Sequence, residues 1–259
     1  RTRAIVPVHY AGVACEYEAI LDLAEGYDLA VVDDAAQGVM ATYNGQALGT
    51  MGDLGAYSFH ETKNIQSGEG GALLVNRKEW VQQAEIIREK GTDRSRYFRG
   101  EVDKYSWQSA GSSFLPGELI AAFLWGQMEE AKRITATRMA TWEYYHAGLE
   151  GLEAQGLLRR PIVPPNCIHN AHMYYVLLSP EFDRPAVLAE LKRRGIGAVF
   201  HYVPLHSSPA GRRYGRSSDT MGVTDSLSER LIRLPLWVGL TQPEQDEIMT
   251  ALRQTIRRS

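Results

Sequence analysis

The stretch VVDDAAQGVM (residues 31–40) is followed further along the chain by SFHETKNIQSGEGGALLVN (residues 58–76). With the two residues before it, the first stretch contains an apolar run, LAVVDD, that predicts a buried strand ending at Asp34. Ligands of open α/β sheets bind outside the carboxyl ends of the strands. A carboxylate at such an end, followed by a lone lysine in a polar, glycine-rich loop, raises the question of what Asp34 and Lys63 hold between them.

Short apolar runs alternate with amphipathic stretches from residue 4 to about residue 90. Near-continuous apolar strands separated by helices are typical of an α/β sheet that is covered on both faces. The pattern predicts strands at residues 4–10, 29–34, 54–60 and 71–76, and helices from residue 15 to Gly26 and from residue 77 to Gly91. We therefore expect an α/β fold for this part of the chain.

The remainder of the chain has a different pattern. Residues 92–113 are polar, rich in aromatics and without periodicity, which predicts a long functional loop. Apolar residues at helical spacing then run from about residue 115 to residue 149. Later stretches predict a strand at 171–180, a helix and a strand within 184–202, and a terminal helix at 243–258. We expect a large domain over residues 1–145, which includes a long bridging helix, and a small C-terminal α+β domain over residues 146–259.

Composition excludes several classes of function. The 259 residues are 44% hydrophobic and 23% charged, with a net charge of −3 and no long block of one sign. No apolar run reaches the ~20 residues that cross a bilayer, and no basic patch suggests a nucleic-acid surface. The histidines form no HExxH arrangement, so no metal site is expected. Two cysteines without a CxxC or CxxH neighbourhood suit the reducing cytoplasm.

Asp34 has two interpretations. Asp34 or Asp33 can simply cap the turn that follows the strand. Alternatively, an ionised carboxylate at this strand end can pair with a protonated ring nitrogen, which is the partner that a pyridine cofactor needs for carbanion chemistry. Both interpretations remain open from the residues alone.

Lys63 and its neighbours are ambiguous in the same way. Strand alternation places Ser58 and His60 on the same face, toward the loop that carries Lys63. A lone loop lysine is ordinarily a solvated charge, but lysine also forms Schiff bases when its surroundings lower the amine pKa. The following SGEGG tolerates positive φ and close backbone approach, and it also fits a plain turn into the next strand.

Three stretches together resemble one family: VVDDAAQG, GDLGAYSFHETKNIQSGEGGALLVN and GIGAVFHYVPLH. They are similar to the DegT/DnrJ/EryC1/StrS sugar aminotransferases, which use pyridoxal 5′-phosphate on the fold type I scaffold. The stretches SFHETKN, KGTDRSRYFRGEVDKYSW and GSSFLPGELIAAFLWGQME resemble the branch that makes dTDP-4-amino-4,6-dideoxygalactose. The resemblance covers essentially the whole chain, and its order and spacing are specific.

The resemblance implies roles for five residues. Lys63 matches the lysine that forms a Schiff base with the cofactor and then shuttles protons. Asp34 matches the partner of the pyridinium nitrogen, and Gln37 matches a residue beside the cofactor ring. Ser58 matches a donor to the cofactor phosphate. His60 is expected to face the substrate or the cofactor.

The chain departs from the family pattern in two places. The family usually has a GxNxR-like stretch where this chain has GSSFL, so Ser113 takes the place of an asparagine that reaches the partner subunit's phosphate site. The chain also begins at Arg1, without the glycine, serine and threonine turn that cradles the phosphate in the family. We expect roughly the first third of a typical member to be missing from this sequence.

The implied reaction is transfer of an amino group from L-glutamate to the 4-keto carbon of a nucleotide-linked 4-keto-6-deoxyhexose. The resemblance points to dTDP-4-keto-6-deoxyglucose, and to cell-surface polysaccharide such as enterobacterial common antigen or O-antigen lipopolysaccharide. The arginines at positions 94, 96 and 99 suit a nucleotide diphosphate, or else a surface or dimer contact. Family members are homodimers with shared sites, so we expect a homodimer here.

Two other functions compete with this one. A dehydratase of the same family has histidine in place of the Schiff-base lysine, and Lys63 argues against it. A non-catalytic remnant that binds nucleotide sugars is the alternative from another class. It is favoured if no phosphate-cradling turn precedes Arg1.

Overall fold

The computed structural model describes residues 1–218 and 220–257. The chain forms two compact units. The first comprises residues 1–135 with residues 163–172, and the second comprises residues 136–162 with residues 173–259. The expected domain boundary between residues 145 and 146 stays a prediction.

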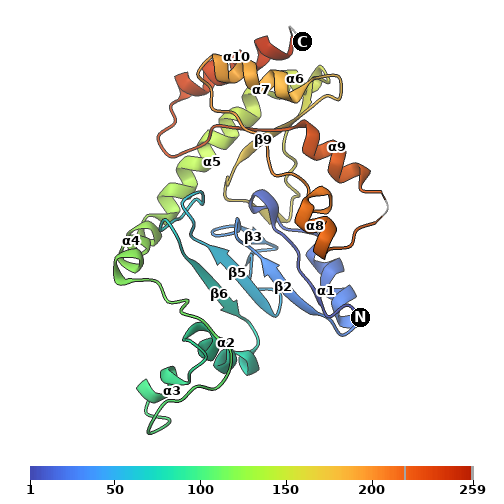
Figure 1. Ribbon diagram of the computed structural model, residues 1–259. Coiled ribbons are helices and arrows are strands. Elements are labelled where there is room, and N and C mark those ends of the chain that lie inside the picture. The colour runs from blue at the N-terminus through green and yellow to red at the C-terminus, as the bar shows by residue number, and fades with distance from the viewer. Residues whose placement is uncertain (219, 258–259) are drawn as a thin grey trace. The chain divides into compact units, whose positions relative to one another are not determined.

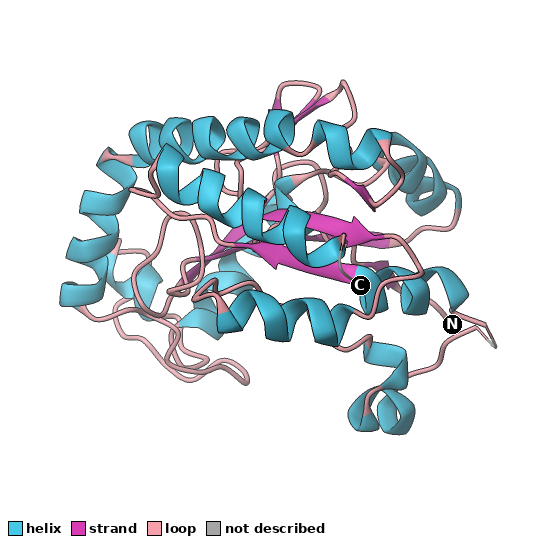
Figure 2. Ribbon diagram, turned by 90° about the horizontal axis from the view of Figure 1, so that it is seen from above, coloured by secondary structure: helices cyan, strands magenta, loops and turns pink. Residues whose placement is uncertain are grey.

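A four-stranded sheet in the order β1-β2-β5-β6 organises the first unit. The sheet is mixed but mostly parallel: β1, β2 and β5 are parallel, and β6 is antiparallel to β5. Strands β2, β5 and β6 of this sheet lie side by side in Figure 1, and Figure 2 shows strands in magenta among cyan helices from above. The strand bounds are β1 Ala4–Ile5, β2 Ala30–Asp34, β5 Leu54–Ser58 and β6 Gly71–Val75. The predicted α/β class is therefore confirmed.

The first strand is shorter than predicted. Residues 4–10 were expected to form a strand, but β1 ends at Ile5, and only an isolated bridge joins Val8 to Asp34. Pro7 explains the interruption, because proline has no N–H to donate to a ladder. The chain then enters the 3₁₀ turn η1, Tyr10–Gly12.

The apolar core of the first unit joins helix, sheet and loop. Helix α1 (Tyr17–Gly26) ends at the predicted glycine. Its buried Tyr17 and Ala24 belong to one hydrophobic cluster with Val31 of β2. A small sheet in the order β4-β3-β8 adds to this unit. Its strands are β3 Thr42–Tyr43, β4 Gln46–Ala47 and β8 Cys167–Ile168.

Helices separated by turns and loops follow β6 as far as Gly148. The elements are η2 Lys78–Trp80, α2 Val81–Arg88, α3 Arg94–Phe98, α4 Glu118–Glu129 and α5 Ala131–Gly148. One prediction holds in part and another is wrong. Residues 92–113 form the expected loop except for the short helix α3 and isolated bridges. The expected single helix over 115–149 is two helices, because the backbone leaves helical geometry at Glu130 (φ −93°, ψ 3°).

The second unit is an α+β structure around the antiparallel sheet β10-β9-β7. Its strands are β7 Leu158–Arg159, β9 Tyr174–Leu178 and β10 Leu231–Leu234. Its helices are α6 Glu150–Ala154, α7 Arg184–Arg193, η3 Leu205–Ser207, α8 Pro209–Tyr214, α9 Gly222–Arg230 and α10 Gln242–Ile256. The terminal helix α10 was predicted and begins with a capping box of Thr241 and Glu244. The strand expected near residues 196–202 does not form, and only a bridge from Val199 to Arg233 remains.

Candidate active site

Lys63 lies in the loop between β5 and β6, and backbone hydrogen bonds close this loop. The N–H of Phe59 donates to the carbonyl of Gly70 at 2.8 Å, and the N–H of Ser67 donates to the carbonyl of Phe59 at 2.7 Å. Phe59 and Ile65 are buried and belong to one hydrophobic cluster. Burying one such side chain contributes about 1.5–3 kcal/mol. The loop is therefore anchored on both sides of Lys63.

The glycines of this loop have the backbone freedom that was predicted for them. Gly68 has φ +80°, a left-handed conformation that other residues adopt only with strain. Within the loop, the Lys63 N–H donates to the carbonyl of His60 at 2.9 Å. This turn fixes the backbone of Lys63, whose side chain is half-buried.

The two aspartates at the end of β2 have different environments. Asp33 is completely buried, where it accepts hydrogen bonds from the Tyr17 hydroxyl and from the Gly52 N–H. Asp34 is half-buried, and its Oδ1 accepts from the Ala36 N–H at 3.1 Å. Asp34 thus caps the turn, as one interpretation proposed, with only one of its two oxygens. A cap of this kind leaves Oδ2 available for a further partner.

Gln37 is held by the chain segment beside β2. Its Oε1 accepts a hydrogen bond of 2.6 Å from the N–H of Ala11. Ala11 has φ +57° and Gly12 has φ +77°, so the backbone turns sharply here. A Cβ on Gly12 would lie 2.2 Å from Asn170 Oδ1, which explains why glycine is needed at this position. Gln37 is therefore fixed in place next to the end of β2.

A small hollow brings three of the predicted residues together: Gln37, Ser58 and Lys63. It lies beyond the carboxyl ends of β2 and β5, where α/β sheets place ligands. Asp34 stands in register with Ala56 of β5, two residues before Ser58. Other residues that line the hollow were not singled out from the sequence; they are Ala36, Val39, Asn64, Ile65, Asn170 and His172. The only signal for the last two was a polar HNAH run directly before an apolar strand.

Ser58 and His60 lie where β5 runs into the loop. Ser58 Oγ accepts a hydrogen bond of 3.3 Å from the His60 N–H. The His60 ring has its Nδ1 3.0 Å from Thr62 Oγ1 and its Nε2 3.7 Å from Glu69 Oε1. The His60 side chain is 39% exposed, so it lies at the solvent side of the loop.

His9 is a buried histidine next to the strand end that carries Asp34. Its backbone N–H donates to the carbonyl of Asp34 at 3.0 Å. Its ring Nδ1 accepts from the Cys15 backbone N–H at 3.4 Å. Its Nε2 is buried and has no hydrogen-bond partner among the described residues. Burial lowers the pKa of His9 below its usual value, although Asp33 and Asp34 act in the opposite direction.

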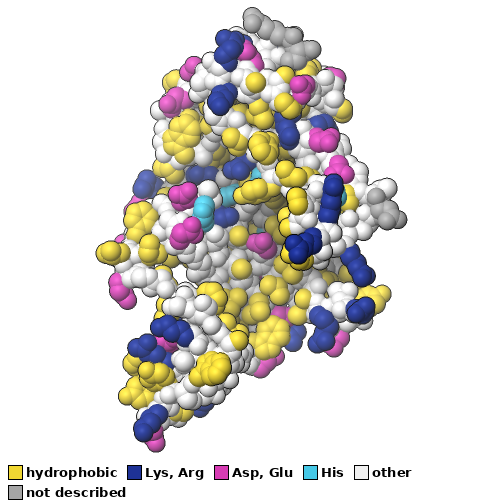
Figure 3. All heavy atoms as spheres, viewed as in Figure 1, with side chains coloured by type: hydrophobic (Ala, Val, Ile, Leu, Met, Phe, Trp, Pro, Cys, Tyr) yellow, Lys and Arg dark blue, Asp and Glu magenta, His cyan; other side chains and the backbone are white. Residues whose placement is uncertain are grey.

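The arginines of residues 94–99 form ion pairs with carboxylates. Arg99 donates two hydrogen bonds to Glu85, at 2.9 and 3.0 Å, and one to Glu101 at 2.6 Å. These bonds raise the pKa of Arg99. Arg96 also pairs with Glu101, at 3.1 Å. Basic and apolar side chains gather on the lobe that carries α2 and α3 (Figure 3).

Arg94 and Ser113 lie on the same part of the first unit. The Arg94 guanidinium lies 5.1 Å from the centre of the Phe98 ring and 3.7 Å from Glu89. Ser113 is exposed and forms a backbone bridge with Glu89. Nothing on this part of the unit lines the hollow beside Lys63.

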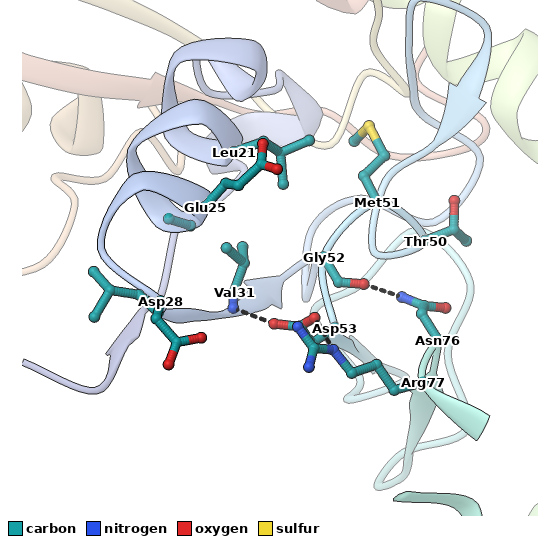
Figure 4. A pocket seen from close by; sticks show the side chains of 12 residues that line it. Leu21, Glu25, Asp28, Val31, Thr50, Met51, Gly52, Asp53, Asn76 and Arg77 are labelled. Carbon is teal, nitrogen blue, oxygen red and sulfur yellow. Dashed lines mark hydrogen bonds and ion pairs between the residues drawn. The ribbon is translucent and has the colours of Figure 1, made fainter. Parts of the chain in front are cut away.

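A larger cavity of about 600 Å³ opens at the other end of β2, beside Val31 (Figure 4). Its main carboxylate, Asp53, already accepts from the Val31 N–H at 2.7 Å and pairs with Arg77. This is the amino end of the parallel strands, opposite to the end where ligands bind. The cavity therefore does not belong to the site around Lys63.

The described residues offer neither a metal site nor a membrane-spanning helix. Among residues 1–218 and 220–257, no group of three or more histidine, cysteine, aspartate or glutamate side chains is arranged to hold a metal ion. None of the helices in the same ranges is long and apolar enough to span a membrane.

The fold and the site define a class of protein. A mostly parallel α/β sheet, a smaller α+β unit and a loop lysine beyond the carboxyl ends of the strands are the features of fold type I aminotransferases. The model of the DegT/DnrJ/EryC1/StrS aminotransferase family matches residues 1–253, and the chain belongs to this family. Aminotransferases of this family use pyridoxal phosphate.

The chain is also similar to individual proteins. The uncharacterized protein MJ1066 of Methanocaldococcus jannaschii is 31% identical over 99% of this chain and 67% of its own length. DesV of S. venezuelae, solved in complex with a ketimine intermediate, is 28% identical with a TM-score of 0.87 over 100% of this chain and 66% of that chain. Helicobacter pylori PseC, an aminotransferase involved in the biosynthesis of pseudoaminic acid, is 22% identical. Its TM-score is 0.88 over 100% of this chain and 68% of that chain. This chain thus spans about two thirds of the length of these relatives.

The side-chain types of the described residues suit the cofactor, whereas the hollow itself encloses only about 10 Å³. Asp34 supplies a carboxylate with one oxygen left for a ring nitrogen, and Lys63 supplies the only amine that lines the hollow. Ser58 adds a hydroxyl and Gln37 adds an amide at the same strand ends. These are the functional groups that a phosphorylated pyridine aldehyde needs.

Proposed function

We propose that the protein transfers an amino group from L-glutamate to the 4-keto carbon of a nucleotide-linked 4-keto-6-deoxyhexose. The observation that carries this proposal is the hollow at the carboxyl ends of β2 and β5, lined by Gln37, Ser58 and Lys63. Pyridoxal phosphate supplies a conjugated ring that stabilises negative charge on the carbon that loses a proton. The products are 2-oxoglutarate and an amino sugar nucleotide.

Lys63 would hold the cofactor and move protons. Its anchored loop keeps Lys63 at the strand ends. As a free amine, Nζ would accept the proton from the carbon that is oxidised and would return a proton to the carbon that gains nitrogen. One amine thus acts as base and as acid, an effect that typically contributes about 10²–10⁴ in rate.

Asp34 would face the ring nitrogen of the cofactor. Its Oδ1 is fixed by the Ala36 N–H, which orients the carboxylate, and Oδ2 then accepts from the protonated nitrogen. Gln37 would lie beside the ring, held by the N–H of Ala11. Ser58 would donate to the phosphate, and His60 would contact the substrate or the cofactor.

The arginines of residues 94–99 would bind the diphosphate of the sugar nucleotide. Three guanidinium groups lie within six residues, together with exposed Phe98, Tyr105 and Trp107. Aromatic faces and guanidinium groups suit a base and its phosphates. Because Arg96 and Arg99 are paired with carboxylates in the structure, substrate binding would require an exchange of ion partners.

The resemblance of KGTDRSRYFRGEVDKYSW and GSSFLPGELIAAFLWGQME supports a particular substrate. We propose dTDP-4-keto-6-deoxyglucose as the acceptor and dTDP-4-amino-4,6-dideoxygalactose as the product. Such amino sugars enter cell-surface polysaccharides, including lipopolysaccharide and enterobacterial common antigen. The cytoplasm, which supplies both glutamate and sugar nucleotides, is the proposed location.

A homodimer with shared sites completes the proposal. Helix α4 is apolar, yet none of its residues is buried. Leu119 is 88% exposed and Trp125 is 69% exposed. Exposed apolar surface of this kind marks an interaction site. A second copy would cover it, and Ser113, five residues before α4, would reach the partner subunit's phosphate site.

The experiment is an assay of amino transfer with the full-length protein, pyridoxal phosphate, L-glutamate and dTDP-4-keto-6-deoxyglucose. Mass spectrometry and NMR of the sugar nucleotide should show the 4-amino product, and 2-oxoglutarate should appear in equal amount. Lys63→Ala should abolish both, whereas Lys78→Ala, at an exposed position, should not. Binding of the sugar nucleotide without turnover in the parent protein would instead favour the non-catalytic alternative.

A further inference from the structure

A buried polar network connects the loop of Lys63 to a segment more than one hundred residues downstream. Asn64 Nδ2 donates to the carbonyl of Asn170 at 2.7 Å. Asn64 Oδ1 lies 3.1 Å from Nδ1 of His172. The three side chains are almost fully buried, with exposed fractions of 9%, 1% and 7% for Asn64, Asn170 and His172. All belong to the first unit.

The same segment also holds the turn after β2. Asn170 Nδ2 donates to the carbonyls of Gln37 at 2.8 Å and of Val39 at 2.7 Å. Asn170 Oδ1 accepts from the His172 N–H at 3.1 Å. The Asn170 side chain therefore ties together the turn that follows Asp34 and the segment that contacts Asn64.

The bonding pattern fixes which atoms donate. Because the Asn64 amide nitrogen donates to Asn170, the Asn64 oxygen is the acceptor, and Nδ1 of His172 must carry the hydrogen. A leucine at position 172 would remove this donor and leave the buried oxygen of Asn64 unsatisfied. An asparagine would place an amide N–H at nearly the same position as Nδ1.

We propose that Asn64, Asn170 and His172 are positioning residues that hold Lys63 against the end of β2, where Asp34 lies. Asn64 is the peptide neighbour of Lys63, and it is the only one of the three that belongs to the lysine loop. Asn170 donates hydrogen bonds to the turn after Asp34, and His172 donates a hydrogen bond to the Asn64 side chain. The proposal rests on the proposed function, because the geometry that the network sets is that of the lysine and the carboxylate.

The competing explanation is that the network only stabilises the fold. Buried polar groups are costly to leave unpaired, so a structural role alone would explain why all of them are hydrogen-bonded. The two explanations differ in one respect. A positioning role predicts that the network matters for cofactor binding only while Lys63 is present to be positioned.

The test is a double-mutant cycle on pyridoxal phosphate affinity, measured by equilibrium dialysis of the full-length protein. His172→Leu should weaken binding about tenfold in the parent and less than about twofold in a Lys63→Ala background. His172→Asn, which keeps a donor, should bind within about twofold of the parent. Thermal unfolding of each protein provides the measure of structural damage.

Two results would overturn the inference. One is an equal loss of affinity with and without Lys63, and the other is no loss in His172→Leu. If His172→Leu fails to fold, Asn64→Ala takes its place in the same cycle with the same criteria. Failure of the proposed function is a separate outcome, because there the parent and Lys63→Ala would bind pyridoxal phosphate equally.

Discussion

The strand ends around Lys63 and the arginine-bearing residues 94–99 are held in opposite ways. At the strand ends, polar side chains are buried or half-buried, and each is fixed by hydrogen bonds at 2.6–3.1 Å within the first unit. On residues 94–99, exposed or half-exposed arginines pair with carboxylates that are close in sequence. Buried networks fix geometry, whereas surface ion pairs are worth about 0–1 kcal/mol and can exchange. The strand ends around Lys63 therefore suit a catalytic site of fixed geometry, and residues 94–99 suit a binding surface that can exchange ion partners.

The two aspartates of β2 give the sharpest test of the rigid region. Asp34→Asn should reduce amino transfer about 100-fold, because the ring nitrogen loses its charged partner. The free energy of unfolding should change little, since the amide oxygen can still accept from Ala36. Asp33→Ala should instead destabilise the fold. The free energy of unfolding should fall by about 2 kcal/mol or more, because the change leaves Tyr17 and Gly52 without an acceptor.

Rate assays and urea unfolding of both variants check this prediction. The comparison breaks down if Asp34→Asn unfolds the protein, or if it transfers amino groups at the parent rate.

Arg99 gives a test of the adaptable region. Arg99→Ala should raise KM for the sugar nucleotide about tenfold through loss of one charge-assisted contact, with kcat within about twofold. The free energy of unfolding should fall by less than about 1 kcal/mol. Glu101→Gln should lower KM at low salt, because it releases Arg96 and Arg99 from a carboxylate. Steady-state kinetics at two salt concentrations measures both effects, and unchanged KM values in both variants would refute the role of these arginines.

The smallest expected effect concerns pH and buried His9. Its pKa is lowered in the folded protein, so below about pH 6.5 the unfolded chain binds a proton that the folded chain does not. The free energy of unfolding should therefore fall as the pH falls, by at most about 1.4 kcal/mol per pH unit from this group. His9→Asn, which keeps an acceptor for the Cys15 N–H, should flatten this slope. Urea unfolding of the parent and of His9→Asn between pH 7.5 and 5.5 measures how the free energy of unfolding depends on pH.

The control for this prediction is Gln46→Asn. Gln46 is exposed and carries no titratable group, so its replacement should leave the slope unchanged. Equal slopes in the parent and in His9→Asn would show that His9 does not carry the acid sensitivity.

Local signals in the sequence predicted much of the first unit. The apolar run before Asp34, and the strands at 54–58 and 71–75 around a glycine-rich loop, are strong patterns of short range. The carboxyl-end rule then indicated where Asp34 and Lys63 would act. The break at Glu130 was missed, because apolar periodicity continues across it and only the local backbone departs from the helix.

The residues that hold the lysine loop could not be predicted from local patterns. Asn64 and Asn170 are 106 positions apart, and a short polar run before a strand does not specify a partner at that distance. The missing strand near residues 196–202 has a local explanation instead: Gly195, Gly197 and Pro204 flank or interrupt the apolar run, and a single bridge at Val199 remains. Tertiary contacts thus decided the first case, and local backbone preference decided the second.

The central claim is that Lys63 is the residue that joins pyridoxal phosphate. The most direct test is to mix the full-length protein with the cofactor, reduce it with borohydride, and map the modified lysine by peptide mass spectrometry. The account predicts the phosphopyridoxyl mass on the peptide that contains Lys63, and loss of that label when L-glutamate is added before reduction. A label on a different lysine, or none at all on the intact protein, would contradict it.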